Sequence, residues 1–165
     1  LKLIFKMNKF ILTFLIIIFS KLYANAEEVT NTFGDWQYYC SDNLERPNCE
    51  IRQFAIDNST NEVVSLISLN FNPENNTQLL VGLPHLINLK IPAIVNVDEK
   101  GKSEVAYTYC NENACFIAEV LTEEYLNLLK AGNIFSIESK LINNEKFKVN
   151  FSLKGFTEAI KNLNN

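Results

Sequence analysis

The sequence predicts a single domain that is mostly β, folded as an antiparallel β-sandwich. About eight or nine short segments rich in β-branched and aromatic residues follow one another at regular spacing. Clusters of Asn, Asp, Gly and Pro separate them, and such clusters are typical of turns. The long alternation of strands with helices that builds a parallel sheet is not present. The pattern favours two packed sheets with short connections.

Residues 1–26 are predicted to be a signal peptide, with translation starting at Met7. Lys9 gives a short positive region, residues 10–19 form an apolar run, and Ala24-Asn25-Ala26 is a small-residue cleavage site. The apolar run is about half of the roughly 20 residues that span a bilayer. We therefore expect no transmembrane segment after cleavage, although an uncleaved N-terminal anchor is the alternative.

The remaining domain, 27–165, is acidic. Cleavage leaves 139 of the 165 residues, which is enough for one domain with a hydrophobic core. The net charge of −4 includes four lysines and no acid within the leader, so the domain alone carries −8. Because nucleic-acid binding depends on Lys and Arg that neutralise phosphates, we expect no nucleic-acid partner.

All four cysteines, Cys40, Cys49, Cys110 and Cys115, follow the leader. An even number in an exported chain indicates disulfides, and four cysteines allow three pairings. The local pairing, Cys40–Cys49 and Cys110–Cys115, is favoured because each pair flanks a short polar turn. A zinc site is the alternative, but zinc ligands usually come in more tightly spaced pairs that often include His. We therefore expect no metal.

The first half of the domain begins with a polar lead-in, residues 27–32, that we expect to be mobile. A bulge is expected in the second strand, because its apolar positions change phase between Ile51 and Phe54. The predicted strands here cover residues 36–40, 49–56, 63–71 and 77–83.

The second half contains further strands and two helices. Thr122 is expected to cap a short helix that ends at Gly132, and a terminal helix follows Gly155. Pro92 confines its strand to an edge or a bulge. The predicted strands cover residues 89–97, 105–109, 115–120, 134–141 and 146–153, and the last alternates between inward apolar and outward polar residues.

These features together resemble the invasion-associated locus B (IalB) family of alphaproteobacteria. The resemblance rests on the export signal, on Phe33-Gly34-Asp35-Trp36 ahead of Cys40 and Cys49, and on Cys110-x4-Cys115 before a capped helix. The ending Leu153-Lys154-Gly155-Phe156 completes it. No single motif is decisive, but their order and spacing are similar to the family over residues 33 to about 163.

The resemblance implies an exported, envelope-located, immunoglobulin-like β-sandwich with two local disulfides. The family name reflects host-cell entry by pathogenic members, and other members occur in bacteria that do not invade. The resemblance supplies no catalytic, cofactor-binding or metal-binding residues. We expect a non-catalytic protein in the periplasm, attached to the outer membrane or secreted, that contacts a protein of the envelope or of a host surface.

Four aromatic residues are the candidate contact surface: Trp36, Tyr39, Tyr107 and Tyr109. The tyrosines lie near the first cysteine of each predicted hairpin, so they form one patch if the two hairpins are adjacent. Large rigid rings favour protein contacts. Trp36 is also interpreted more simply as a core aromatic beside a disulfide.

Two other functions remain open. Binding of a small envelope ligand is the first alternative, and a cleft between the sheets with convergent polar groups would favour it. A hydrolase is the second, and it would have to use His85, the only imidazole in the chain. That mechanism requires His85 within hydrogen-bonding reach of a carboxylate and a hydroxyl.

Overall fold

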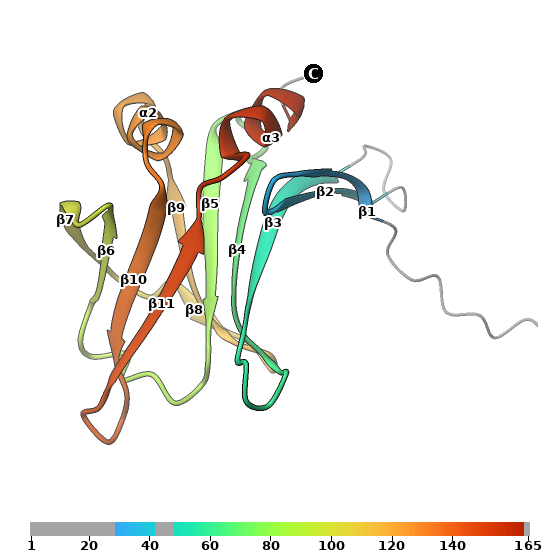
Figure 1. The fold of residues 1–165 in the computed structure, drawn as a ribbon. Helices are drawn as coiled ribbons and strands as arrows, with labels where there is room; N and C mark the ends of the chain where they lie inside the picture. Colours follow the sequence, from blue (N-terminus) through green and yellow to red (C-terminus); the bar gives the residue numbers. More distant parts are fainter. Residues whose placement is uncertain (1–28, 42–47, 164–165) are drawn as a thin grey trace, which may run out of the picture.

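The structure is a computed structural model that describes residues 29–41 and 48–163. The predicted signal peptide lies outside these residues. Two antiparallel sheets pack face to face, with two helices at one end (Figure 1). The prediction of a mostly β, antiparallel sandwich with one helix between strands and one at the C-terminus is confirmed. Neither helix in the described ranges is long and apolar enough to cross a membrane.

The larger sheet has seven strands and is built mainly as a meander, because its first five strands are consecutive in the chain. In spatial order its strands are β1 (Val29–Phe33), β2 (Trp36–Ser41), β3 (Asn48–Ile56), β4 (Val63–Phe71), β5 (Thr77–Leu83), β9 (Cys115–Val120) and β8 (Tyr109–Cys110).

The smaller sheet has four strands, and its side chains alternate as the sequence predicts. In order they are β11 (Lys146–Ser152), β10 (Ile134–Lys140), β6 (Ala93–Val97) and β7 (Lys100–Val105). On β11, Val149 and Phe151 are buried while Lys148 is exposed. This alternation turns one face of the sheet toward the core.

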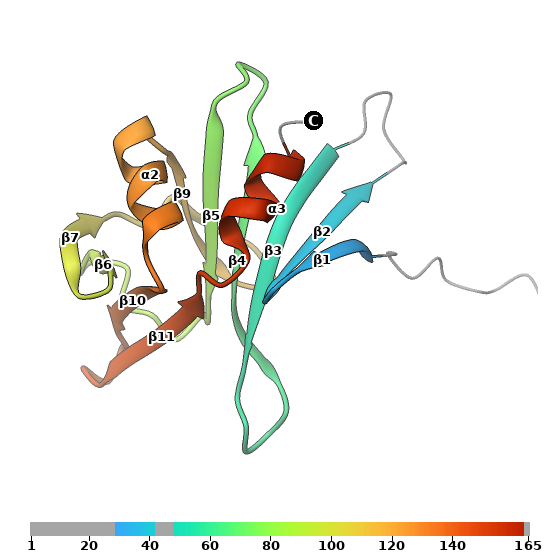
Figure 2. The same ribbon diagram turned by 45° about the horizontal axis from the view of Figure 1, so that its top comes forward.

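Two helices lie at one end of the sandwich. Thr122 caps α2 (Glu123–Ala131), because its hydroxyl accepts a hydrogen bond of 3.2 Å from the Tyr125 amide. Helix α3 (Phe156–Leu163) packs on β1, β2 and β3, where the seven-stranded sheet extends beyond the four-stranded one (Figure 2). It therefore completes the layer that covers the inner face of the larger sheet.

The structure corrects several predicted elements. Residues 29–32 belong to strand β1 and pair with β2 instead of forming a mobile lead-in. The bulge in β3 falls at Ala55–Ile56, and Phe54 points outward in regular register. Residues 89–92 form a turn ahead of β6, so Pro92 lies outside the sheet. Residues 106–108 connect β7 to β8 and cross from one sheet to the other.

The turn between β1 and β2 meets the turn before α3, backbone against backbone. The Asp35 amide donates to the Lys154 carbonyl at 3.1 Å. Gly34 and Gly155 both have positive φ, +58° and +85°. A Cβ on Gly155 would lie 2.1 Å from the Phe33 carbonyl oxygen, so only glycine permits this approach. We call this contact, between residues 33–35 and 154–155, the glycine clasp.

Candidate functional site

Both disulfides join residues that face each other directly across a hairpin. Cys40 pairs with Cys49 between β2 and β3, and Cys110 pairs with Cys115 between β8 and β9. The structure therefore has the local pairing that the sequence favours, and it holds no free cysteine. In the described part of the chain, no three His, Cys, Asp or Glu side chains gather as a ligand set for a metal.

The two disulfide hairpins lie far apart in the seven-stranded sheet. Strands β4 and β5 separate β3 from β9. The adjacency on which a single tyrosine patch depended is therefore wrong. Tyr39 and Tyr109 nevertheless share the outer face of this sheet, since they pair across the ladder with the outward residues Glu50 and Phe116.

Two of the predicted contact residues, Trp36 and Tyr107, do not lie on the exposed outer face of the sheet. Trp36 is completely buried, so its assignment to the contact surface is wrong and its interpretation as a core aromatic is confirmed. Its indole Nε1 donates to the Ser152 carbonyl at 3.0 Å, and its ring meets that of Phe156 edge to face. Tyr107 is half-buried against the core, and this burial raises the pKa of its hydroxyl.

An apolar row crosses the outer face of the seven-stranded sheet. Register places one residue of each of five neighbouring strands in line: Phe54, Leu66, Gly82, Phe116 and Tyr109. A Cβ on Gly82 would lie 3.0 Å from Phe116 Cε1 and 3.1 Å from Leu66 Cγ, so both side chains close over the glycine. We call these five residues the outer row.

Both ends of the outer row are open to solvent. Tyr109 is 47% exposed and stacks on Phe116 with the ring centres 5.0 Å apart, which leaves Phe116 only 7% exposed. Phe54 is 36% exposed. The helices pack on the opposite face, and no helix in the described ranges covers the outer row.

Aromatic and cationic groups continue this face beside the outer row. The Arg52 guanidinium lies 4.5 Å from the centre of the Tyr39 ring and 5.3 Å from that of Phe54. Glu50 pairs with the same guanidinium at 3.5 Å. Arg52 is thus fixed between two rings, a geometry that favours cation–π attraction.

Sequence reasoning missed Phe54, Leu66 and Phe116, although a signal was present. Leu66 precedes the core residue Ile67, and Phe116 precedes the core residue Ile117. Successive strand residues point to opposite faces, so adjacent apolar residues indicate an apolar outer face.

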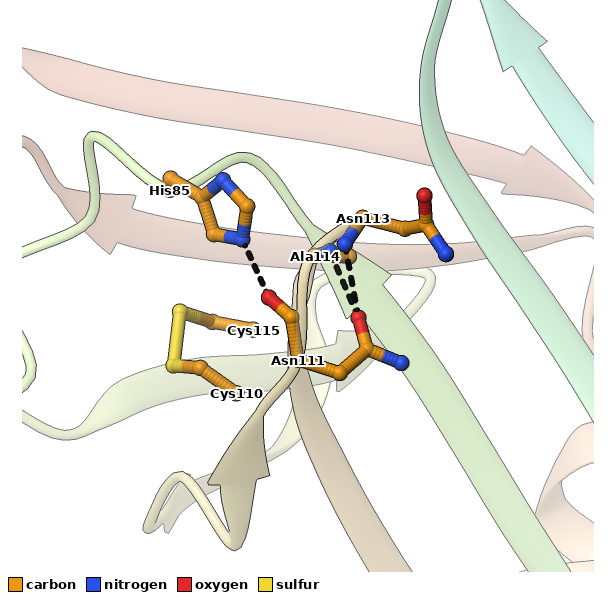
Figure 3. Close-up of a disulfide and its surroundings, with 6 residues drawn as sticks. All are labelled: His85, Cys110, Asn111, Asn113, Ala114 and Cys115. Atoms are coloured by element: carbon orange, nitrogen blue, oxygen red, sulfur yellow. Dashed lines mark hydrogen bonds between the residues drawn. A yellow bond between two sulfur atoms is a disulfide. The ribbon is translucent and has the colours of Figure 1, made fainter.

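His85 lies beside the second disulfide hairpin and supports its turn. Its Nε2 atom lies 2.7 Å from the Asn111 carbonyl oxygen. Figure 3 draws this contact beside the Cys110–Cys115 disulfide. The Asn111 side chain caps the same turn by accepting hydrogen bonds from the amides of Asn113 and Ala114. Within the described residues this imidazole contacts a backbone carbonyl, so it lacks the carboxylate and hydroxyl partners that a hydrolase needs.

A cleft of about 260 Å³ opens between the two sheets, beside β7 at the edge of the smaller sheet and beside the part of β9 that extends past the two-residue edge strand β8. Its walls are the inward side chains of Leu79, Val81, Val95, Val105 and Ile117. Tyr125, from the first turn of α2, lines one end. The sheets therefore enclose an accessible hollow at this side of the sandwich.

The comparisons with known proteins agree on one family. The family model described as invasion associated locus B (IalB) protein matches residues 36–164. The crystal structure of invasion associated protein b from Bartonella henselae has a similar fold, with a TM-score of 0.74 and 22% identity, over 82% of this chain and 95% of that one. No curated protein matches. Because the family model matches well over half of the sequence, the chain belongs to the IalB family.

Proposed function

We propose that this protein is an exported, non-catalytic component of the cell envelope that acts through protein contacts. The observation that carries this proposal is the outer row, whose exposed ends are the aromatic side chains of Phe54 and Tyr109 and which no helix in the described ranges covers. Its partner lies in the envelope or on the surface of a host cell. The matching solved structure is itself named invasion associated.

The chemistry of this face suits a protein partner. Phe54, Tyr109 and Tyr39 are large rings that bury area on binding while losing few rotatable bonds. Arg52 adds a guanidinium fixed between rings. Aromatic residues and Arg are enriched at the centres of protein interfaces.

Export is supported by the cysteine chemistry. Each disulfide joins two strands of a hairpin, and in each at least one cysteine is partly or fully exposed. Disulfides form and persist in oxidising compartments and are rare in the cytosol. Intact-mass measurement of the protein from envelope fractions should give a chain that begins at Glu27, with all four cysteines resistant to alkylation. A protein recovered from the cytosol with reactive thiols would contradict export.

The contact face is tested by site-specific photo-crosslinking in cells. A benzophenone amino acid at position 109 should give a discrete crosslinked protein. The same probe at Ile94, an exposed apolar residue of the other sheet, is the matched control.

A second substitution shows whether the crosslink reports a real interface. Phe54→Ser should abolish the adduct formed from position 109, and a circular dichroism spectrum like that of the parent protein should show that the variant still folds. Equal adducts from positions 109 and 94, or an adduct that survives Phe54→Ser, would count against the outer row.

Binding of a small ligand between the sheets is a second candidate function. The observation that favours it is the cleft beside β7 and β9, where apolar walls meet the Tyr125 hydroxyl. The Tyr125 oxygen is shielded from solvent and has no hydrogen-bond partner among the described residues.

A further inference from the structure

Strand β7 is an open edge of the smaller sheet. It pairs with β6 on one side, and within the described residues no backbone hydrogen bond joins its other side to another element. All of its residues except Val105 are exposed. In both views β7 lies at the margin of the molecule, farther out than β9 (Figure 1 and Figure 2). Its free side is therefore accessible to another strand.

The opposite edge of the same sheet is joined to the larger sheet. On β11 the Ser152 amide donates to the Gln53 side chain, and the Ser152 carbonyl accepts from Gln53 and from Trp36. Strand β7 has no such contacts in the described part of the chain. An edge with unused backbone groups is a template for the addition of a strand.

The register of β7 with β6 fixes which way its side chains point. Ser103 pairs with the buried Val95 and therefore faces inward. Glu104 pairs with the outward residue Ile94, and Lys102, on the other side of Ser103, shares that outer face. Neither Lys102 nor Glu104 has an ion-pair partner among the described residues. The exposed edge thus carries one cation and one anion, both unpaired, on either side of Ser103.

This arrangement is complementary to a second copy of itself. Residues directly opposite each other in an antiparallel pair share a face of the sheet. When Ser103 lies opposite Ser103 of a second copy, Lys102 lies opposite Glu104 of that copy. The two-fold symmetry repeats the same pair on the other side of the axis. This register therefore forms two pairs of opposite charge on the outer face.

The same charges disfavour the neighbouring registers. A slide of the second copy by two residues in one direction places Lys102 opposite its own counterpart. The same slide in the other direction places Glu104 opposite its counterpart. Like charges directly opposite each other are destabilising. The side chains of β7 therefore select a single antiparallel register.

We propose that two copies of this chain pair antiparallel through β7, with Ser103 on the two-fold axis. The pairing joins the two four-stranded sheets into one continuous sheet. The paired stretch is short, because the register of β7 shifts beside Gly101, where φ is +61°. We therefore expect a weak and reversible dimer.

The dimer adds to the proposed protein contacts without depending on them, because the outer row lies on the other sheet. The two-fold axis of an antiparallel strand pair is perpendicular to the sheet. Both copies therefore turn their outer rows toward the same side. A partner with two sites would then bind the dimer more tightly than the monomer.

Charge reversal tests the proposal on the mature protein purified from the envelope. Sedimentation of the parent protein up to about 1 mM should show a monomer–dimer equilibrium. Lys102→Glu and Glu104→Lys each convert both pairs to like charges and should raise the dimer Kd at least roughly tenfold. The double variant exchanges the two charges and should dimerise like the parent. Lys148→Glu, an exposed change on β11 of the same sheet, is the control and should leave the Kd unchanged.

A mixture of the two single variants gives the sharpest result. One variant carries two glutamates at the edge and the other carries two lysines, so each alone should be monomeric and the mixture should form a heterodimer. Recovery of the dimer would also show that both variants fold. A parent protein that is monomeric at every concentration would overturn the proposal. So would a dimer that both single variants retain, because it would form through another surface, or a mixture that stays monomeric.

Discussion

The two sides of this sandwich are closed in different ways. On the β1–β3 side, backbone and side-chain hydrogen bonds join the sheets, and the glycine clasp brings residues 34 and 155 into contact. On the β7–β9 side, the sheets separate around the 260 Å³ cleft and acidic side chains face solvent. Close contacts between backbone atoms therefore hold the sheets together on the β1–β3 side. The β7–β9 side instead contains a hollow and exposed acidic side chains.

The difference shows that one small fold can place its stabilising contacts on one side and a candidate binding cleft on the other. Gln53 bridges the sheets on the closed side: it donates to the Ser152 carbonyl at 3.1 Å and accepts from the Ser152 amide at 2.9 Å. Such a satisfied network fixes geometry. On the open side the Tyr125 hydroxyl has no hydrogen-bond partner among the described residues, and such a polar group can serve a ligand.

Gly155→Ala should have the largest effect on stability. The substitution combines a positive φ with a clash against the backbone of Phe33, so we expect a loss of about 3 kcal/mol or more in chemical denaturation. Gly101→Ala on the open side also has a positive φ, but its Cβ meets only the tip of Leu128. It should lose about 1 kcal/mol. Equal losses would show that strain in φ, and not the clasp, determines both.

Removal of the disulfides should have the next largest effects. In the chain-entropy model, Cys40–Cys49, with a separation of 9, contributes about 2.6 kcal/mol, and Cys110–Cys115, with a separation of 5, about 2 kcal/mol.

The paired Cys→Ser variants should also differ locally. Strand β8 has only two residues, so loss of the second disulfide should raise hydrogen exchange at Phe116 and Ala118. Strand β2 has a longer ladder with β3 and should keep its protection. Loss of β2 protection would contradict this comparison.

Gln53→Met should lower stability by about 1–2 kcal/mol, because it leaves the backbone amide of Ser152 without its partner. Gln78→Met, on the outer face of the same sheet, is the control. A change within about 0.5 kcal/mol is expected there. Similar losses in thermal denaturation would show that the inter-sheet bridge is not special.

Asp98→Asn should have the smallest effect on stability of these variants, and this effect should depend on pH. Backbone amides of Asn133 and Ile134 donate to the Asp98 carboxylate and hold its pKa below the ordinary value. The folded state therefore binds this proton less readily than the unfolded state. The contribution is present above about pH 4 and is lost as the pH falls through the lowered pKa.

The variant should melt at a lower temperature than the parent protein at pH 7, and this difference should shrink toward pH 3. Glu99→Gln in the same turn is the control, because its carboxylate has no such donors among the described residues. A Tm difference that stays constant with pH would contradict the assigned role.

Local chemistry made much of the fold predictable. Thr122 and Gly132 bound α2 where their capping preferences place them, and β4, β5 and β9 match their predicted ranges. Register between distant segments was not predictable. Residues 29–32 look like a polar tail until β2 is present to pair with them.

The candidate site was predictable in part. Tyr109 lies on an exposed face as expected, whereas Trp36 is buried, with its ring against Phe156 and its indole bonded to the Ser152 carbonyl. The outer row and the cleft depend on which strands become neighbours, and this order is set by the packing of the whole chain. A single sequence carries no local signal for it.

The glycine clasp has a consequence for the order of folding. It joins positions 121 residues apart, so the loop that it closes contains most of the domain. A chain that emerges N-terminus first presents Trp36 early, yet the segment that covers this side chain comes last. The indole therefore stays exposed to water until residues 152–156 have been synthesised and have packed against it. Its fluorescence should report this last step of folding.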